Sequence, residues 1–195
     1  PTSPFARIVK GALIEKNLLG VTTEVWVDPW ASPAELLAVN PLCQVPTLVL
    51  DDGQILTNSS TIIDWLERAF PVPPLLPAAP RDCARVLAVA ALAHGAIESV
   101  VYVVIERRKL AGQQNEDMLR RRLQGIERVL GVLAEQFACG REPFHLDGLN
   151  MACMLGYVDL RLPELDWKTR YPRLAQWQRW AAARPSLQQS APPPQ

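Results

Sequence analysis

Residues 40–59 decide the fold of the first part of the chain, and they read NPLCQVPTLVLDDGQILTNS. Two apolar runs, Val45–Leu50 and Gln54–Leu56, stand on either side of the turn sequence Asp51-Asp52-Gly53, and this pattern is typical of a β-hairpin. Asn58-Ser59 follow at once, and such side chains commonly cap the start of a helix. The stretch therefore predicts a hairpin that leads directly into a helix.

The residues before this stretch predict a mixture of helix and strand. Ser3-Pro4 places a hydroxyl before a proline, as at many helix starts, and apolar residues recur on one helical face from Phe5 to Leu13. Val21–Val27 is rich in β-forming residues and predicts a strand. Ser32-Pro33 predicts a short helix that ends before Asn40-Pro41. The first part of the chain is therefore expected to be an α/β domain.

The residues after this stretch predict a linker followed by helices. Residues 71–80 are rich in proline and predict an extended connection. Apolar side chains then recur at spacings of three and four, and the helices are expected over 81–109, 119–137, 147–160 and 171–184. We predict an α/β domain over residues 1–71, a linker over 72–80 and an all-helical domain over 81–195.

Composition narrows the classes of function. Twenty basic and twenty acidic residues cancel, so the chain lacks the positive charge of a nucleic-acid or anionic-membrane binder. The longest apolar stretch, Val86–Ile97, is shorter than a bilayer span, and no secretory leader opens the sequence. The cysteines lack the spacing of metal ligands, and they are Cys43, Cys83, Cys139 and Cys153. We predict a cytoplasmic protein without a metal, nucleic-acid or membrane partner.

Five stretches resemble bacterial glutathione S-transferases. Residues 2–7 (TSPFAR) resemble the active-site turn of that family, 40–46 (NPLCQVP) the loop that leads to its cis-proline, and 52–59 (DGQILTNS) its hairpin and γ-glutamyl-binding turn. Residues 155–159 (LGYVD) and 171–174 (YPRL) resemble late helices of its second domain. The resemblance implies a thioredoxin-like domain followed by an all-helical domain. The first strand of the thioredoxin-like domain would precede Pro1, so we expect it to be missing from this chain.

The resemblance also implies a site for glutathione, a tripeptide with two carboxylates, an amine and a thiol. A cis Val45–Pro46 bond would expose backbone groups that pair with the cysteinyl unit, and Ser59 would hold the γ-glutamyl carboxylate at a helix start. Gln44 would reach the glycyl end, and Phe5 belongs to the same predicted site. The family usually has an acidic residue at the position of Asn58, so binding of the amine is expected to be weaker here.

Ser3 is the predicted partner of the glutathione thiolate, with Thr2 as the fallback. A hydroxyl donor at a helix start favours the thiolate over the thiol, and each unit of pKa shift corresponds to about 1.4 kcal/mol. The Ser3 hydroxyl could also be an ordinary helix cap, and a residue upstream of Pro1 is a further alternative for the thiolate partner. Relatives that reduce disulfides carry Cys in this turn, and Ser3 cannot form the mixed disulfide that their chemistry requires.

The predicted function is conjugation of glutathione to a hydrophobic electrophile, as in detoxification. Ile97, Val101, Tyr102 and Ile105 lie along the first long helix and could line the pocket for this second substrate, although core packing would explain each of them too. The resemblance also implies a homodimer. Glutathione would be a co-substrate, and no metal is required.

Two alternatives remain open at this stage. One is a non-catalytic member of the same fold that acts as a binding or interaction module, because fold does not fix function. The neutral Asn58 and the segment His145–Gly148, which lacks the usual capping box of the family, favour it. In that segment Asp147 is an alternative cap. The other alternative is a thiol-dependent peroxidase or reductase, for which Cys43 is the candidate.

Overall fold

The computed structural model describes residues 2–110, 112–136 and 143–192. The chain divides into two compact units. The first unit comprises Pro1–Leu76 together with Pro185–Gln195, and the second comprises Pro77–Arg184.

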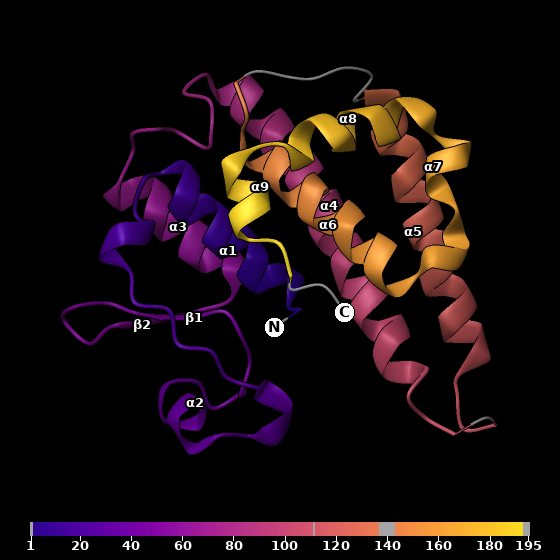
Figure 1. Cartoon of the computed structure of the whole chain (residues 1–195), viewed down its shortest axis with the longest axis horizontal. Coiled ribbons are helices and arrows are strands. Elements are labelled where there is room, and N and C mark those ends of the chain that lie inside the picture. Colours follow the sequence, from indigo (N-terminus) through magenta and orange to yellow (C-terminus); the bar gives the residue numbers. More distant parts are fainter. Residues whose placement is uncertain (1, 111, 137–142, 193–195) are drawn as a thin grey trace. The chain divides into compact units, whose positions relative to one another are not determined.

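The first unit combines a small hairpin with helices (Figure 1). Its elements are α1 (Pro4–Glu15), η1 (Leu19–Val21), η2 (Pro29–Ala31), α2 (Ala34–Val39), β1 (Thr47–Val49), β2 (Ile55–Thr57), α3 (Ser59–Ala69) and α9 (Pro185–Gln189). The strands pair antiparallel with Leu48 opposite Leu56, which confirms the predicted hairpin. Helix α1 packs against α3 and α9, and its predicted apolar face, which includes Ile8 and Ala12, is buried.

The prediction of a strand over Val21–Val27 is wrong. Val21 ends the short helix η1, and residues 22–28 form neither helix nor strand. The side chains of Val21, Val25 and Trp26 are 83%, 74% and 62% exposed. A strand forms only where a neighbouring strand completes its hydrogen bonds, and the described part of the sheet contains β1 and β2 alone. Residues 21–27 therefore have no neighbouring strand with which to pair in the described part of the chain.

A buried lysine joins α1 to the end of α3. The side chain of Lys16 is 0% exposed, and its ammonium group forms an ion pair with Glu67. It also donates hydrogen bonds to the carbonyl oxygens of Phe70, at 2.7 Å, and Pro73, at 3.0 Å. The carboxylate of Glu67 accepts from the backbone N–H groups of residues 75–76. An ammonium group has three donors, and here each of them has an acceptor.

The second unit is all-helical and centred on α6. Its elements are α4 (Pro80–Glu106), α5 (Glu116–Gln136), α6 (Leu146–Arg161), η3 (Pro163–Leu165), α7 (Trp167–Arg170) and α8 (Pro172–Ala182). Helix α4 packs against α5 and α6, and α6 also contacts α8 (Figure 1). Every residue of α6 from Leu146 to Leu155 is buried, as expected of a helix that is covered on several sides. The predicted apolar stripes of α5 and α8 contribute Ile126 and Trp177 to this core.

Helix α4 is long and apolar enough to cross a membrane by length and composition alone. A core helix of a soluble protein passes the same test. In α4, the side chains of Ala93, Val100 and Val103 are fully buried within the second unit. Packing against α5 and α6 accounts for the buried part of this apolar stretch, which is 39% of it.

The boundaries of the two units differ from the prediction at both ends of the helical part. The second unit begins at Pro77, within the predicted linker, and residues from Pro185 onward group with the first unit. There the guanidinium group of Arg7 donates to the carbonyl oxygen of Leu187 at 3.1 Å, and the hydroxyl of Ser186 donates to the carboxylate of Glu15. These bonds hold α9 against α1.

Candidate functional site

The register of the hairpin brings two of the predicted site segments together. Thr47 lies directly opposite Thr57, so Val45–Pro46, which precede β1, and Asn58–Ser59, which follow β2, flank the same end of the hairpin. The Val45–Pro46 peptide bond is cis, the isomer that the resemblance implies. Half-buried Val45 therefore lies beside a helix start, in a place where an extended peptide could pair with its backbone.

A buried asparagine fixes the loop before Val45. The side chain of Asn40 is 2% exposed. Its amide group donates to the carbonyl oxygen of Gln44 at 2.9 Å and to the hydroxyl of Thr47 at 3.1 Å. Its carbonyl oxygen accepts from the N–H of Leu42 at 3.0 Å. Sequence reasoning placed Asn40 at a helix end and at the start of the loop 40–46, but it missed this role, which the unusual burial of an asparagine reveals.

The start of α3 has the geometry of an anion site. The side chain of Asn58 caps the helix by accepting from the N–H of Ser60 at 2.9 Å. Its backbone has a φ of 72°, a region that asparagine enters more readily than most residues. Ser59 is the first helical residue and is 3% exposed. The N–H groups of the first turn and the positive end of the helix dipole favour a carboxylate here.

Ser3 is the cap of α1. Its Oγ accepts from the backbone N–H of Ala6 at 3.3 Å, which uses an acceptor lone pair of the hydroxyl. A serine hydroxyl also carries one donor, so capping and donation to a thiolate are compatible. The side chains of Ser3, Thr2 and Phe5 are all half-buried.

The two remaining predicted residues in this region lie on the loop before β1. Gln44 is exposed, as a side chain that reaches a ligand from solvent would be. Cys43 has a φ of 50°, and its thiol lies 3.5 Å from the carbonyl oxygen of Pro29, to which it donates. The Cys43 sulfur is therefore engaged with the backbone. Cys139 lies outside the described residues.

The apolar side chains predicted to line the second-substrate pocket become more exposed toward the end of α4. Ile97 is 0% exposed, Val101 is half-buried and Ile105 is exposed. Ile97 is therefore a buried core residue, and this corrects its assignment to a ligand pocket. Val101 and Ile105 are one helical turn apart and remain available to a ligand.

Tyr102 is held by charged groups at the end of α4. Its hydroxyl donates to the carboxylate of Glu106, and the guanidinium group of Arg122 lies 5.2 Å from the centre of its ring. The pKa of the Glu106 carboxyl lies below its ordinary value. The main cause is the N–H of Asn115, which donates to it at 2.8 Å, and the ammonium group of Lys109 and the Tyr102 hydroxyl add to the effect. Burial of the carboxyl acts in the opposite direction. Any role of the Tyr102 hydroxyl in catalysis would require it to leave Glu106.

The two histidines lie on the second unit. His94 is half-buried on α4, with its Nε2 3.9 Å from Glu98, and His145 precedes α6. Among the described residues, no cluster of three or more His, Cys, Asp or Glu side chains could hold a metal ion.

Comparison with known proteins finds a matching family model and similar bacterial proteins. Residues 2–69 match the family model described as the glutathione S-transferase N-terminal domain. An Escherichia coli K12 protein, called uncharacterized GST-like protein YibF, is 31% identical over 98% of this chain and 96% of its own length. A maleylacetoacetate isomerase of Pseudomonas aeruginosa is 29% identical over 80% of this chain and 74% of its own length.

A solved structure of a similar protein has a similar fold. A glutathione transferase family member from Pseudomonas fluorescens Pf-5, crystallised with bound glutathione, is 34% identical and has a TM-score of 0.89. The alignment covers 99% of this chain and 96% of that one. This likeness confirms the predicted fold class, a thioredoxin-like part followed by a helical part.

Proposed function

Because the chain belongs to the glutathione S-transferase family, we propose that it binds glutathione in the first unit and transfers the glutathione sulfur to an apolar electrophile. The observation that carries the proposal is the hairpin register, which sets Val45–Pro46 beside the start of α3. The bound glutathione of the Pseudomonas fluorescens structure supports it.

In this proposal each polar part of glutathione meets a group of the first unit. The cysteinyl backbone pairs with the N–H and C=O of Val45, as an added strand would. The γ-glutamyl carboxylate sits at the first turn of α3, at Ser59. Gln44 donates to the glycyl carboxylate, and the side chain of Asn58 accepts from the ammonium group. Phe5 packs nearby from α1.

Ser3 supplies the donor for the sulfur. A free thiol has a pKa of about 8.5, so only a small fraction is ionised at neutral pH. Donation from the Ser3 hydroxyl, together with the dipole of α1, stabilises the thiolate. The thiolate then attacks the electrophilic carbon and forms the S–C bond, while the leaving group departs with its electron pair. In an addition reaction, the carbanion formed instead takes a proton from water.

The electrophile is proposed to rest against the exposed end of the α4 stripe. Val101 and Ile105 offer an apolar surface there, and Tyr102 lies beside them on the same helix. Ile97 supports this surface from within the core. The proposal further includes a homodimer in the cytoplasm and a role in removing reactive apolar compounds, as the family resemblance implies.

The first experiment measures glutathione binding and turnover in the same preparations. Calorimetry of the full chain should show saturable binding of glutathione, and mixing with a chloronitrobenzene electrophile should give a conjugate. Ser3→Ala should lower kcat by about tenfold or more, corresponding to about 1.4 kcal/mol of transition-state stabilisation, and should change binding little. Ser60→Ala, another hydroxyl at a helix start, is the matched control and should change neither.

The same data distinguish the alternatives. Absence of glutathione binding at millimolar concentration would favour a non-catalytic binding module. If alkylation of Cys43 abolished all activity while Ser3→Ala changed nothing, a thiol-dependent peroxidase or reductase would replace the proposal. Asn58→Asp should tighten glutathione binding, because a charged acceptor forms a stronger hydrogen bond with an ammonium group.

A second candidate activity is isomerisation of a conjugated double bond, which the similarity to a maleylacetoacetate isomerase favours. The glutathione thiolate would add to the double bond, the resulting single bond would rotate, and the thiolate would leave again. Glutathione is consumed in conjugation but regenerated in isomerisation. Measuring free thiol during turnover of a cis-unsaturated keto acid therefore separates the two activities.

A further inference from the structure

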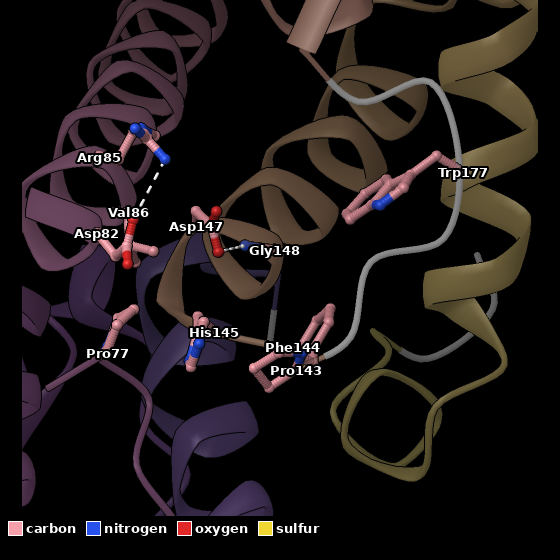
Figure 2. Close-up of a pocket in the computed structure, with 10 residues that line it drawn as sticks. All are labelled: Pro77, Asp82, Arg85, Val86, Pro143, Phe144, His145, Asp147, Gly148 and Trp177. Carbon is pink, nitrogen blue, oxygen red and sulfur yellow. Dashed lines mark hydrogen bonds and ion pairs between the residues drawn. The ribbon is translucent and has the colours of Figure 1, made fainter. Parts of the chain in front are cut away.

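The described part of the second unit could receive a small molecule at either end of α4 and α6. A cavity of about 370 Å³ lies between the starts of these helices and the side of α8 (Figure 2). Asp82, Asp147 and Arg85 line it, and Arg85 pairs with Asp82 at 3.2 Å. At the opposite ends of the two helices, Val101 and Ile105 form the surface proposed for the electrophile. The charged groups beside that surface identify the class of ligand more closely.

Arg108 extends the proposed electrophile surface by one turn. The N–H of Arg108 donates to the carbonyl oxygen of Ile105 at 3.1 Å, just after the end of α4. Side chains three residues apart in such a turn lie on the same side, and the side chain of Arg108 is exposed. A ligand that rests against Val101 and Ile105 therefore meets a cationic group next to them.

A second guanidinium group comes from the last turn of α6. The guanidinium group of Arg161 lies 5.9 Å from the centre of the Tyr157 ring and donates to the Tyr157 hydroxyl. The charge of Arg108 also acts on this hydroxyl. Tyr157 is buried, whereas Arg161 is half-buried. Two cationic side chains, one from the end of each helix, therefore lie near the same phenol.

Tyr157 does not cancel the charges of these arginines. Burial raises the pKa of the Tyr157 hydroxyl above its ordinary value, although the charges of Arg161 and Arg108 act in the opposite direction. A tyrosine with a pKa above about 10 is uncharged at neutral pH. The phenol therefore acts as a neutral hydrogen-bonding group that holds the Arg161 side chain in place.

The acidic side chains of the two helix ends leave positive charge in excess. Residues 105–109 and 157–168 carry five basic and four acidic side chains. Three of the acids each pair with a different basic side chain, at 2.9, 2.8 and 2.6 Å: Glu106 with Lys109, Asp159 with Lys168 and Glu164 with Arg107. The fourth, Asp166, is exposed and accepts from the hydroxyl of Thr169. The balance of charge therefore favours an anion at Arg108 and Arg161.

We propose that the electrophile carries a carboxylate, which binds Arg108 and Arg161 while its apolar body rests against Val101 and Ile105. This inference rests on the proposed function, because it names the substrate class of the same surface. A guanidinium group binds a carboxylate through two parallel hydrogen bonds. Val101 and Arg108 are seven residues apart, about 10 Å along a helix, which leaves room for a substituted ring and its carboxylate. Tyr157 is a positioning residue, since it acts through Arg161.

The test compares 4-chloro-3-nitrobenzoate with 4-chloro-3-nitrobenzamide as substrates of the full chain. Both release chloride when the glutathione thiolate attacks, and they differ in the charge of the group opposite the chlorine. Arg108→Gln and Arg161→Gln should each raise the KM for the benzoate about tenfold, with kcat little changed, and should alter the KM for the amide less than about twofold. Arg107→Gln, which removes the neighbouring arginine that pairs with Glu164, is the matched control and should keep the preference for the benzoate.

A measurement on the unaltered protein keeps the test decisive if a variant does not fold. The KM for the benzoate should be lower than that for the amide and should rise with salt concentration, because salt screens charges. The KM for the amide should stay constant. Equal KM values for the two compounds would overturn the inference, and so would a preference for the benzoate that survived both Arg108→Gln and Arg161→Gln. In either case conjugation of both compounds would leave the proposed function standing.

Failure of the proposed function would give a different result, in which neither compound forms a conjugate. Calorimetry without glutathione would then compare 4-methyl-3-nitrobenzoate, which has no leaving group, with its amide. Binding of the benzoate in preference to the amide, lost in Arg108→Gln and kept in Arg107→Gln, would support the anion site by itself. Equal binding of the two compounds, or binding of neither, would overturn it.

Discussion

Two buried polar groups, one in each unit, are hydrogen-bonded to different degrees. In the first unit, Lys16 is fully enclosed, and each donor of its ammonium group has an acceptor. In the second unit, the Nδ1 of His145 and the Oδ1 of Asn150 are buried without a hydrogen-bond partner among the described residues. A fully partnered buried group holds a structure together, whereas an unpartnered one weakens the fold unless water or a ligand reaches it.

The starts of α1 and α3 differ from the start of α6. Side chains cap α1, through Ser3, and α3, through Asn58. The cap residue of α6, His145, makes no such bond. A side-chain cap contributes about 1 kcal/mol. The helix starts proposed to bind glutathione are therefore set in place by the chain itself, while the start of α6 borders an open cavity.

The largest effect is expected from breaking the lysine network of the first unit. Lys16→Met should lower the free energy of unfolding by about 3–5 kcal/mol, because it leaves the Glu67 carboxylate without its buried counter-charge. Urea unfolding, followed separately for each unit by hydrogen exchange, measures the loss. Lys10→Met is the matched control. Lys10 pairs with Glu24 near the surface and should cost at most about 1 kcal/mol, so equal losses in the two variants would contradict the comparison.

The next effect tests how tightly the start of α6 is packed. A Cβ atom at Gly148 would lie 2.8 Å from the ring of Phe144, so Gly148→Ala should destabilise the second unit by about 1–3 kcal/mol through overpacking. Thermal unfolding measures the change. Gly95→Ala places the same methyl group where nothing lies within 4 Å. That variant should stabilise α4 by up to about 1 kcal/mol, and a loss there would show that the Phe144 contact is not the cause.

A smaller effect should come from placing a capping side chain at position 145, where His145 makes no cap bond. His145→Ser should raise the free energy of unfolding by about 0.5–1 kcal/mol, since a serine at this position can accept from an N–H of the first turn. His145→Ala removes the imidazole without adding a cap and isolates the contribution of the cap. If the serine variant were no more stable than the alanine variant, the start of α6 would already be satisfied in another way.

The smallest effect concerns pH and a carboxylate at the far end of α4. Because the pKa of Glu106 is lowered in the folded chain, its contribution to stability is complete above the ordinary glutamate pKa of about 4.3. That contribution is lost as the pH falls below this value and through the folded-state pKa. The stability difference between the wild type and Glu106→Gln should therefore be constant near neutral pH and shrink below about pH 4.3. Urea titrations at several pH values measure it, and a difference that grew toward acid would refute this sign.

Local signals predicted the parts of the fold that depend on neighbouring residues. The turn at Asp52-Gly53 and the cap at Asn58 fixed the hairpin and the start of α3, because both act within a few residues. The strand predicted over 21–27 failed, since a strand needs a partner that local pattern cannot supply. The network of Lys16 joins residues more than fifty positions apart, and no spacing rule reveals it.

The residues of the candidate site could be predicted where a local sequence signal marks them. Ser3 and Asn58 carry helix-start signals, and the structure places both as caps. Ile97 looked like its neighbours Val101 and Ile105, and only three-dimensional packing assigns it to the core. The bond between Tyr102 and Glu106 spans one helical turn, so their spacing could have suggested it. The cavity beside α6 could not be predicted, because its wall comes from three helices.

Helix α9 has a consequence for how the molecule is made. Ser186 bonds to Glu15 across 171 positions of sequence, so the unit synthesised first cannot be finished until the ribosome has produced the whole of the second. During translation, the side of α1 that contacts α9 is therefore exposed to solvent. Chaperones or other proteins can bind it at that stage. An N-terminal fragment that stops at Leu76 would keep that exposed side permanently.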